Sequence, residues 1–517
     1  MTIIMNIDQF AYDAVPYPSF TFSQTHPDHL ATMASFNGVN PAEPKKCRVL
    51  ELGCGDGTNL LWCASTLGES EFVGIDLSQN HIDGANSGAV ELGLTNVSFF
   101  REDIMEFDRD KFGEFDYIVA HGLFSWVPVQ VREKLLQIYS DCLAPNGVGY
   151  ISFNAYPGCH VQRMIRDMML FHTNGFSAPT EKVLQARALI KFIGDTAEVD
   201  SIYQKILKSE VDLLDDRSGS SVFHDDLSEV NDAFYFLEFV EMIKPHGLQF
   251  LCEAKSSSQH KINWTPSSVD AFNSLGDDIL RREQYLDFII GRRFRSTLVC
   301  RESVMVNRDC TPEISRYFIA SKLKPLSENL DIASLDSERF GVEDGTSIET
   351  NHPFTKAALV HLNRIGGEEI RFEDLVRECI ALGGNRDASN LEEDKVRTAG
   401  FLVELYKVGF VHLRRRPARY ASCAGEMPEG SRFARWQVGR KSNAVRTLTG
   451  SNLKLEGNYV LALLAMLDGT RDRTTLAKEL TRLFESDGAK REDFEKDLPE
   501  SINRVLSELA SFGLLAK

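Results

Sequence analysis

The sequence predicts an α/β protein with a Rossmann-like, seven-stranded sheet, helical insertions and a mainly helical C-terminal region that holds two winged-helix-like units. Three observations support this prediction. A strand, a glycine-rich turn and a helix follow one another at residues 49–67. Apolar strand patterns then alternate with helical patterns as far as position 301, which is typical of a parallel sheet covered by helices. Residues 311–517 contain a weak internal repeat of paired helices.

The first strand and its glycine turn predict a nucleotide-binding corner. Residues 49–52 predict a buried parallel strand that includes Glu51, and residues 60–67 predict the helix that follows. The turn between them has three glycines at alternate positions, Gly53, Gly55 and Gly57. A Cβ there would resist a positive φ and hold a ligand away from the backbone. The helix amino terminus adds free N–H groups and a partial positive charge.

Two acids follow at the ends of the next two strands. Residues 72–77 predict a strand that reaches Asp76, about twenty residues past the turn, where a carboxylate can bind both ribose hydroxyls. Asp103 lies just past the apolar start of residues 97–104, where it can accept a hydrogen bond from an exocyclic amine such as that of adenine. The dinucleotide fingerprint is not met, because Thr58 stands where its third glycine would be.

The order of these motifs resembles that of class I S-adenosylmethionine-dependent methyltransferases. The resemblance implies a class I methyltransferase sheet and S-adenosyl-L-methionine as the cofactor. A dinucleotide enzyme and an inactive scaffold are the alternatives. The cofactor site that we expect comprises Glu51, Gly53, Gly55, Gly57, Asp76, Leu77, Asp103, Ile104 and His121.

Composition predicts a soluble, cytoplasmic protein of two to four domains. The chain has 517 residues, of which 43% are hydrophobic and 26% charged. We expect no membrane insertion, because no apolar run is long enough to span a bilayer, and no signal peptide, because the first residues lack a basic region. The ten cysteines form no C-x-x-C pair, which favours a reducing compartment and argues against a disulfide framework or a zinc site. No other metal motif is present.

The charge is strongly asymmetric along the chain. The net charge is −18, and nearly all of it falls on the first 310 residues, because residues 311–517 contain 31 basic and 32 acidic residues. An acidic catalytic half argues against nucleic acid as a substrate. It mildly favours a cationic substrate such as a lysine-bearing protein, although a generic acidic surface explains the same charge.

An aromatic segment precedes the first strand. Residues 8–40 include Tyr12, Tyr17, Phe20 and Phe22, a composition that is unusual for a disordered tail. The segment either packs over the cofactor as a lid or covers a face of the sheet.

The ends of the fourth and fifth strands supply the expected acceptor site. Residues 115–120 predict a strand that ends at His121, and residues 148–154 predict a strand that ends at Asn154. Ligands of open α/β sheets bind beyond the carboxyl ends of strands. The side chains expected to face the site are therefore His121, Trp126, Asn154 and Tyr156. A satisfied loop histidine is the alternative for His121.

Helical patterns dominate the rest of the first half and interrupt the sheet. A helix is expected over residues 230–243, a helical insert around residues 267–292, and two more strands at 248–253 and 294–301, the last one antiparallel. We expect six segments: an aromatic lid segment (1–40), a cofactor-binding core (41–158), a helical insertion (159–222), a region that completes the sheet (223–305), and two winged-helix-like units (306–425 and 426–517).

The C-terminal repeat predicts the two winged-helix-like units. Residues 357–379 and 460–484 each predict a pair of helices, and Gly409 and Gly513 each follow a further helix, 104 residues apart. A basic linker joins the units. A protein-contact or dimerisation role is favoured over DNA binding, since this half is nearly neutral. The linker contains Arg414, Arg415, Arg416, Arg419, Arg432, Arg435, Arg440, Lys441 and Arg446.

Further stretches resemble bacterial methyltransferases that carry a methyltransferase regulatory domain. These stretches are Y-D-A-V-P-Y-P-S-F, F-S-Q-T-H-P-D-H-L, A-H-G-L-F-S-W-V-P, N-A-Y-P-G and R-R-F-R-S-T-L-V-C. The group includes protein-lysine methyltransferases of outer-membrane proteins. The resemblance implies a cofactor domain, a helical middle domain, a C-terminal domain and a homodimer. Cys159 departs from the pattern, because an aromatic residue is expected there.

These observations favour a methyltransferase that acts on lysine side chains of a protein. The lysine must be neutral to attack, and aromatic desolvation or a nearby Tyr or His can achieve this. The candidate catalytic residues are His121, Tyr156 and Tyr17, and the candidate substrate-binding residues are Tyr12, Tyr17, Trp126, Asn154 and Tyr156. A small-molecule O- or N-methyltransferase and a non-catalytic cofactor sensor are the alternatives.

Overall fold

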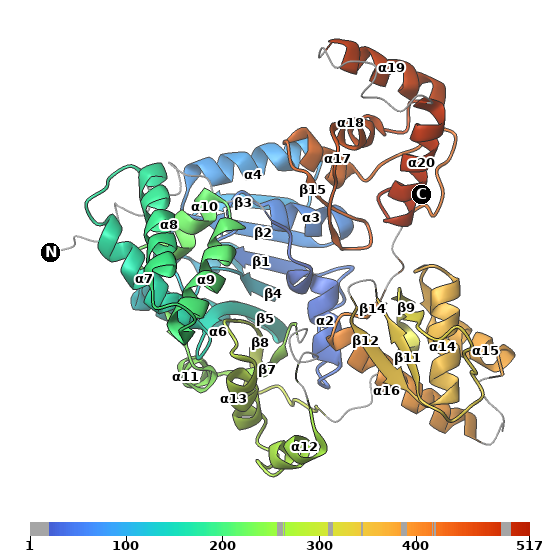
Figure 1. Cartoon of the computed structure of the whole chain (residues 1–517), viewed down its shortest axis with the longest axis horizontal. Helices are drawn as coiled ribbons and strands as arrows, with labels where there is room; N and C mark the ends of the chain where they lie inside the picture. The colour runs from blue at the N-terminus through green and yellow to red at the C-terminus, as the bar shows by residue number, and fades with distance from the viewer. Residues whose placement is uncertain are drawn as a thin grey trace. The chain divides into compact units, whose positions relative to one another are not determined.

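The computed structural model describes residues 20–255, 262, 264–308, 314–342, 345–383, 390–415, 417, 420–486 and 498–517. The chain divides into two compact units, drawn in Figure 1. The first comprises Met1–Ala89 and Thr95–Cys310, and the second comprises Val90–Leu94 and Thr311–Lys517. Tyr12 and Tyr17 lie outside the described residues.

The seven predicted strands form one sheet in the first unit, in the order β3-β2-β1-β4-β5-β8-β7. Strands β1 to β5 are parallel, and β8 is antiparallel to both β5 and β7, which confirms the predicted antiparallel last strand. The strands are β1 (Arg48–Leu52), β2 (Glu71–Asp76), β3 (Val97–Arg101), β4 (Phe115–Ala120), β5 (Leu143–Ala155), β7 (Leu248–Glu253) and β8 (Phe294–Arg301).

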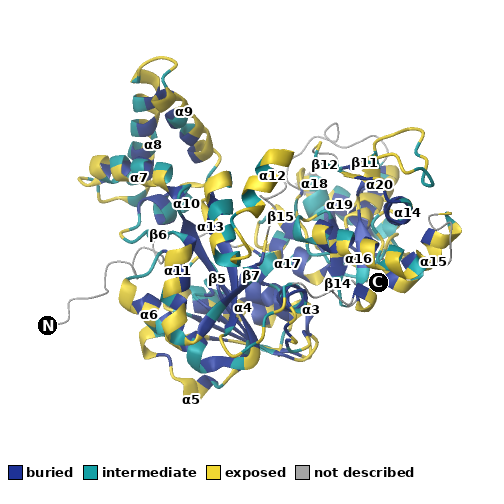
Figure 2. Ribbon diagram, turned by 90° about the horizontal axis from the view of Figure 1, so that it is seen from below, coloured by how far each residue is buried: buried dark blue, intermediate teal, exposed yellow. Residues whose placement is uncertain are grey.

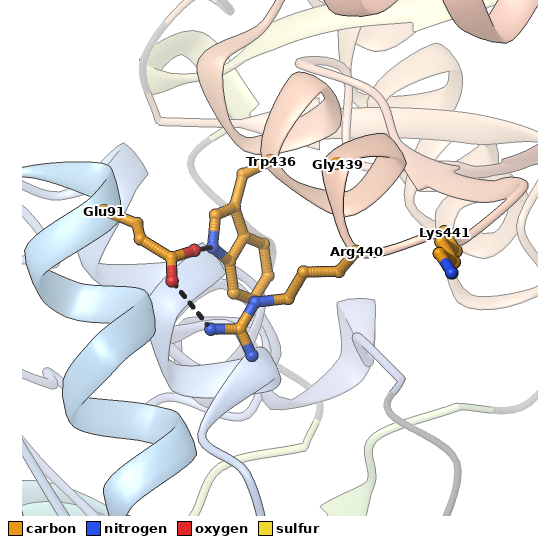
Figure 3. Close-up of a pocket in the computed structure, with 5 residues that line it drawn as sticks. All are labelled: Glu91, Trp436, Gly439, Arg440 and Lys441. Carbon is orange, nitrogen blue, oxygen red and sulfur yellow. Dashed lines mark hydrogen bonds and ion pairs between the residues drawn. The ribbon is translucent and has the colours of Figure 1, made fainter.

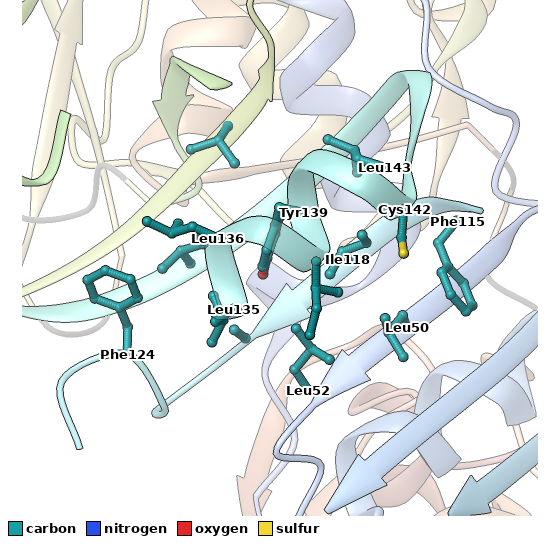
Figure 4. Close-up of a cluster of buried hydrophobic side chains, with 14 of the residues drawn as sticks. Leu50, Leu52, Phe115, Ile118, Phe124, Leu135, Leu136, Tyr139, Cys142 and Leu143 are labelled. Carbon is teal, nitrogen blue, oxygen red and sulfur yellow. The ribbon is translucent and has the colours of Figure 1, made fainter. Parts of the chain in front are cut away.

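Strand alternation assigns the two faces of the sheet. Leu50 and Leu52 point to a core that also contains Ile118 and the buried side chains of α6 (Val129–Cys142) and α11 (Phe236–Ile243), as Figure 4 shows in part. Glu51, between them, points to the opposite face, where Asn59 of α3 (Thr58–Thr66) donates a hydrogen bond to it. The sheet is therefore covered on both faces, as parallel sheets require.

The helices of the first unit follow the predicted alternation with strands. Those around the sheet are η1 (Ser23–Thr25), α2 (Pro27–Ser35), α3 (Thr58–Thr66), α4 (Gln79–Leu92), η2 (Ile104–Glu106), α5 (Arg109–Phe112), α6 (Val129–Cys142), α11 (Phe236–Ile243), η4 (Lys244–His246), α12 (Pro266–Asn273) and α13 (Ile279–Ile290).

The helical insertion forms its own small core. It consists of α7 (Cys159–Thr173), α8 (Pro179–Thr196), α9 (Ile202–Asp215), α10 (Gly219–Ser221) and η3 (Val222–Asp226). Ile165, Met169, Ile190 and Leu207 are buried together, so the methionines of α7 include core residues. The outer faces of α8 and α9 are exposed, as Figure 2 shows.

The predicted helix over residues 230–243 is wrong in its first part. A two-residue strand, β6 (Ala233–Phe234), pairs with the end of β5, and α11 begins only at Phe236. The preceding residues have other hydrogen-bond partners: Asn231 Oδ1 accepts from Asn154 Nδ2 at 2.9 Å, and Asp232 N donates to the Ser125 carbonyl at 2.8 Å. These tertiary contacts outweigh the helical pattern of the segment.

The second unit contains two helical groups, each with short strands. The first group consists of η6 (Ile314–Arg316), β9 (Phe318–Ser321), β10 (Lys324–Pro325), β11 (Glu338–Gly341), β12 (Ser347–Thr350), α14 (Pro353–Arg364), β13 (Ile370–Arg371), α15 (Phe372–Ala381), α16 (Leu391–Lys407) and β14 (Val411–Arg414). The second consists of α17 (Arg432–Gly439), β15 (Ala444–Arg446), β16 (Asn452–Lys454), α18 (Asn458–Met466), α19 (Arg473–Ser486) and α20 (Leu498–Ser511). Strands β13, β9 and β14 form an antiparallel sheet beside three helices, which is a winged-helix arrangement.

The repeat is visible in the backbone of both groups. Gly409 follows α16 with φ +89°, and Gly513 follows α20 with φ +69°. A left-handed glycine is the usual way to end a helix before an extended segment. The stretch expected to be a basic linker is partly folded, because α17 and β15 lie inside it and Ala434 and Val445 belong to the second core. Arg416 and Arg419 lie outside the described residues.

One surface pocket of the second unit is drawn in Figure 3. The carboxylate of Glu91 accepts hydrogen bonds from Trp436 Nε1 at 2.7 Å and from Arg440 at 3.2 Å. The Arg440 guanidinium lies 4.7 Å from the centre of the Trp436 ring, so the three side chains hold one another in place. Among the described residues, no helix is long and apolar enough to cross a membrane.

Candidate active site

The three glycines after β1 all have positive φ but differ in what surrounds them. Their φ values are +69°, +55° and +74° for Gly53, Gly55 and Gly57. A Cβ on Gly55 would meet no described atom within 4 Å, whereas a Cβ on Gly57 would lie 2.7 Å from the Phe99 ring. Gly55 therefore opens the backbone towards a ligand, and Gly57 permits close packing under the turn.

Asp76 links the glycine turn to the end of β2. Its Oδ2 accepts a hydrogen bond from Gly55 N at 2.9 Å, and its Oδ1 accepts one from Ser78 N at 2.9 Å. Each carboxylate oxygen has a second lone pair, so the side chain is held in one orientation and can still accept from ligand hydroxyls. The next residue, Leu77, is 38% exposed and offers an apolar surface there.

Asp103 is held at the end of β3 in a similar way. Its side chain accepts a hydrogen bond from Met105 N at 2.9 Å and caps the short helix η2. Ile104 packs against the core under the sheet. Asp103 is therefore an oriented acceptor at the third strand end.

Glu51 is a buried acid with one unpaired oxygen. The residue is 4% exposed, and its Oε1 accepts from Asn59 Nδ2 at 2.9 Å. Its Oε2 is buried without a hydrogen-bond partner among the described residues. Burial raises the pKa of Glu51 to about 8, although the hydrogen bond from Asn59 acts to lower it. A buried carboxylate oxygen without a donor suits a cationic ligand group such as an ammonium.

The described part of the aromatic N-terminal segment contacts Asn59, His121 and the end of β7. Phe22 N donates to Asn59 Oδ1 at 2.9 Å, and the Phe22 ring lies 3.7 Å from the centre of the His121 ring. Further on, His29 Nε2 lies 2.6 Å from the carbonyl oxygen of Ala254, which follows β7. The described part of the segment therefore contacts the end of β7, and its role as a lid over the cofactor stays a prediction.

His121 follows β4 and is held by the neighbouring strand. Its Nδ1 lies 2.9 Å from the hydroxyl of Tyr150 on β5. Burial lowers the pKa of His121 to about 4, so the ring is neutral at physiological pH. A neutral imidazole in this position accepts or donates hydrogen bonds but is a weak base.

Trp126 lies on the loop after β4, and this loop is hydrogen-bonded to Asn154 near the end of β5. Asn154 N donates to Ser125 Oγ at 2.8 Å, next to Trp126. The Nε1 of Trp126 is buried and has no hydrogen-bond partner among the described residues. A buried indole N–H without an acceptor is costly, so it suits an acceptor that arrives with a ligand.

Tyr156 belongs to an aromatic group beyond β5. Its ring stacks on His160 at 4.1 Å and lies 5.3 Å from the ring of Tyr235. His160 Nε2 lies 3.1 Å from the Tyr235 hydroxyl. Tyr156 also lines a narrow pocket with Gln162 and Arg166, among other residues.

The comparisons with known proteins match three parts of the chain. Residues 49–147 match the family described as "Methyltransferase domain", and residues 218–301 match "Predicted methyltransferase regulatory domain". Residues 426–513 match "PKMT, C-terminal winged helix domain". An uncharacterised Rickettsia prowazekii protein is 36% identical over 403 residues, which is 77% of this chain and 72% of that protein. The chain belongs to the methyltransferases that carry a methyltransferase regulatory domain.

Two solved structures extend the likeness over nearly all of this methyltransferase. PKMT2 from Rickettsia typhi is 28% identical, and the match covers 97% of this chain and 100% of that chain with a TM-score of 0.83. The same protein in complex with AdoHcy matches with a TM-score of 0.82. A 2-heptyl-1-hydroxyquinolin-4(1H)-one methyltransferase from Mycobacteroides abscessus is 38% identical, over only 20% of this chain.

This methyltransferase uses S-adenosylmethionine, as predicted from the glycine and acid motifs. The residues present fit that molecule. Three features lie at the ends of the neighbouring strands β1 and β2: the open side of Gly55, the oriented carboxylate of Asp76 and the unpaired Oε2 of Glu51. Among the described residues, no group of three His, Cys, Asp or Glu side chains is placed to hold a metal ion.

The structure divides the predicted site residues between two groups of contacts. Glu51 and His121 are linked through contacts of Phe22 and Asn59. Asn154 at the end of β5 and Tyr156 just after it instead contact residues 231–235. Sequence reasoning missed the side chains that join these residues, namely Asn59, Tyr150, Asn231, Tyr235 and Ser296. Asn59 offered a signal, because it is a polar residue two positions after the last glycine of the turn. Tyr150 offered none, because a tyrosine is common inside a strand.

Proposed function

We propose that this methyltransferase transfers methyl groups to lysine side chains of a protein substrate. The observation that carries the proposal is the likeness to PKMT2 over 97% of the chain, including the winged helix at residues 426–513 that is typical of PKMT proteins. The strongly acidic first 310 residues support a cationic substrate.

We assign the cofactor to the carboxyl ends of β1, β2 and β3. In this assignment Asp76 accepts hydrogen bonds from the ribose hydroxyls, Asp103 accepts from the adenine amine, and Glu51 pairs with the ammonium. The exposed Leu77 supports an apolar adenine contact. The complete assigned set is Glu51, Gly53, Gly55, Gly57, Asp76, Leu77, Asp103, Ile104 and His121.

The cofactor supplies an activated sulfonium methyl for in-line displacement, so the protein has to align the acceptor and exclude water. A lysine must be deprotonated first, because its ordinary pKa is about 10.4. We propose that Trp126, Asn154 and Tyr156 line a dry acceptor channel, and that neutral His121 accepts a hydrogen bond from the acceptor amine. Catalytic or substrate-binding roles for Tyr12 and Tyr17 remain predictions.

We further propose that the protein is a cytoplasmic homodimer and that it does not act on nucleic acid. We also propose that the chain divides into the six segments predicted from the sequence. Nine cysteines of the described residues are free thiols, which supports a reducing compartment. The arginines of the C-terminal half take part in contacts such as that of Arg440 with Glu91, which supports a structural role for them.

The direct test is incubation of the full chain with tritiated S-adenosylmethionine and a cell lysate, followed by gel separation and mass spectrometry. Label on lysines of protein bands supports the proposal. Label only in small molecules supports a small-molecule methyltransferase, a reading that the short quinolone methyltransferase match allows. Cofactor binding without any label indicates a non-catalytic cofactor sensor.

Replacing Asp76 with alanine is expected to weaken cofactor binding about 10- to 100-fold. The loss of charge-assisted hydrogen bonds costs roughly 1.5–3 kcal/mol. Titration calorimetry measures the affinity, and thermal melting checks that the loss of the Gly55 and Ser78 contacts has not unfolded the protein. Asp83→Ala, an exposed acid on α4, is the matched control. Unchanged affinity in folded Asp76→Ala would remove Asp76 from the site.

Replacing Trp126 or Tyr156 with alanine is expected to lower turnover while cofactor affinity and melting temperature stay nearly unchanged. This result follows if both line the acceptor channel. If they are packing residues, the loss falls on stability instead, at about 3–5 kcal/mol. Turnover, affinity and melting are compared with those of Trp264→Ala, a tryptophan that is 38% exposed. A collapsed melting temperature with normal turnover of the folded fraction would contradict the channel.

A further inference from the structure

A chain of hydrogen bonds runs from His121 to β8. The hydroxyl of Tyr150 donates to Ser296 Oγ at 3.0 Å, and the same hydroxyl lies 2.9 Å from His121 Nδ1. A phenol has one proton, so a hydroxyl that donates to Ser296 is an acceptor towards its other neighbours, which are His121, Gln24 and Ser152. The Nδ1 of His121 then carries the proton, and Nε2 keeps its lone pair.

Ser296 is itself fixed by a buried ion cluster. The backbone N of Ser296 donates to Glu253 Oε2 at 3.1 Å, and Thr297 Oγ1 donates to Glu253 Oε1 at 2.6 Å. Glu253 in turn accepts from Arg295 Nη1 at 2.7 Å. Arg295 is fully buried, so this part of β8 has little freedom to move.

We propose that Tyr150 and Ser296 are positioning residues that hold His121 in the Nδ1–H tautomer, so that Nε2 is an uncharged hydrogen-bond acceptor in the methyl-transfer site. The inference deepens the proposed function and rests on the assignment of His121 to that site. Glu253 and Ser296 fall within residues 218–301, the region that matches the regulatory-domain family. The proposal therefore assigns this region a role in orienting His121.

The tautomer matters because a donor and an acceptor at Nε2 have opposite effects on an amine. A neutral amine that attacks a methyl group must keep its lone pair free for the methyl carbon, and it has N–H groups to donate. An acceptor at Nε2 orients such an amine. A donor at Nε2 would instead hydrogen-bond the lone pair and compete with attack. The lowered pKa of His121 supports the same picture, because the ring stays neutral.

Three variants test the proposal on the full chain. Tyr150→Phe removes the acceptor of the Nδ1 proton, and Ser296→Ala frees the Tyr150 proton to turn towards Nδ1. Tyr139→Phe is the matched control, because Tyr139 is an equally buried tyrosine whose hydroxyl donates to the Tyr150 carbonyl at 2.7 Å and not to His121. Long-range proton–nitrogen NMR on histidine-labelled protein reports the tautomer, with His121→Asn to assign the signal.

The expected result is an Nδ1–H tautomer in the wild type and in Tyr139→Phe. Tyr150→Phe should give a mixture of tautomers, and Ser296→Ala should shift it to Nε2–H. Turnover is expected to fall roughly tenfold in Tyr150→Phe and Ser296→Ala but not in Tyr139→Phe, with cofactor affinity retained. An Nε2–H tautomer in the wild type, or equal turnover losses in Tyr150→Phe and Tyr139→Phe, would overturn the proposal.

These readouts separate this inference from the proposed function. The NMR signal needs no acceptor, so the tautomer is measured whatever the enzyme methylates. If the labelling experiment finds a small-molecule acceptor, the lysine proposal fails and the tautomer result still stands. If labelled lysines are found but the NMR signal shows the Nε2–H tautomer of His121, only the positioning role of Tyr150 and Ser296 fails.

Discussion

Replacing Arg295 with methionine is expected to lower the free energy of unfolding of the first unit by about 3–5 kcal/mol, because it leaves buried carboxylates without their partner. The guanidinium contacts three acids: Asp287 through Nε at 2.9 Å, Glu253 through Nη1 at 2.7 Å and Glu283 through Nη2 at 3.1 Å. It also lies 3.9 Å from the centre of the Phe236 ring. Arg292 alone cannot replace these contacts, since it binds Asp287 at 2.6 Å and lies 3.9 Å from Glu253.

The loss should grow as the pH rises. Burial alone would raise the pKa of Glu253, but Arg295 and Arg292 hold it below its usual value. A depressed carboxylate pKa contributes stability that is present above the unfolded-state pKa of about 4.5 and is lost as the pH falls through the folded-state value. This contribution is already complete at pH 5 in the wild type. Without Arg295, burial raises the pKa of Glu253 above its usual value, so the variant loses further stability as the pH rises and its difference from the wild type is larger at pH 8 than at pH 5.

Urea denaturation measures the effect, and hydrogen exchange of β7 and β8 peptides locates it. Arg132→Met is the matched control, because Arg132 is also buried but its partner Asp232 has a side chain that is 41% exposed and stays hydrated. A smaller loss, about 1 kcal/mol, is expected there. If Arg295→Met loses no more than Arg132→Met, the cluster does not stabilise the first unit as described.

The sheet could be predicted because its signals are local. Each strand is a short apolar run that ends at a polar or glycine position, and the carboxyl ends of parallel strands must meet at one edge. This reasoning brought Asp76 and Asp103 to the same edge as the glycine turn, and it identified the antiparallel last strand. The spacing of the glycine turn, Asp76 and Asp103 also carried the resemblance from which the cofactor was predicted.

The parts that could not be predicted depend on contacts between distant residues. The 230–243 segment has helical spacing, yet Asn231 and Asp232 bond to residues 77 and 107 positions away, and β6 replaces the first helical turn. The sequence shows only that Glu51 is acidic. Which of its two oxygens is left without a hydrogen bond is set by the position of Asn59 in the fold. The hydrogen bonds that link His121 to Ser296 pass through Tyr150 on β5. His121 and Ser296 are 175 residues apart in sequence, and no motif connects them.

Glu51 leads to the second large effect, which is a release of one proton when the cofactor binds. Its pKa of about 8 in the cofactor-free protein means that the carboxyl is mostly protonated at pH 6 to 7. The ammonium of the cofactor favours the ionised form, so binding is coupled to deprotonation. Affinity is expected to rise by up to about tenfold per pH unit between pH 6 and 8, and Glu51→Gln should weaken binding about 100-fold at pH 8.

The same pKa predicts the opposite trend for the stability of the cofactor-free protein. A carboxyl whose folded-state pKa is raised contributes stability that is fully present below its unfolded pKa of about 4.5 and is lost as the pH rises towards 8. The cofactor-free wild type should therefore lose stability relative to Glu51→Gln over this range, up to about 1.4 kcal/mol per pH unit. Calorimetry in two buffers of different ionisation enthalpy counts the released protons, and denaturation at several pH values tests the stability. Binding without proton uptake or release at pH 7, with the same pH profile in the wild type and in Glu51→Gln, would show that Glu51 does not face the ammonium.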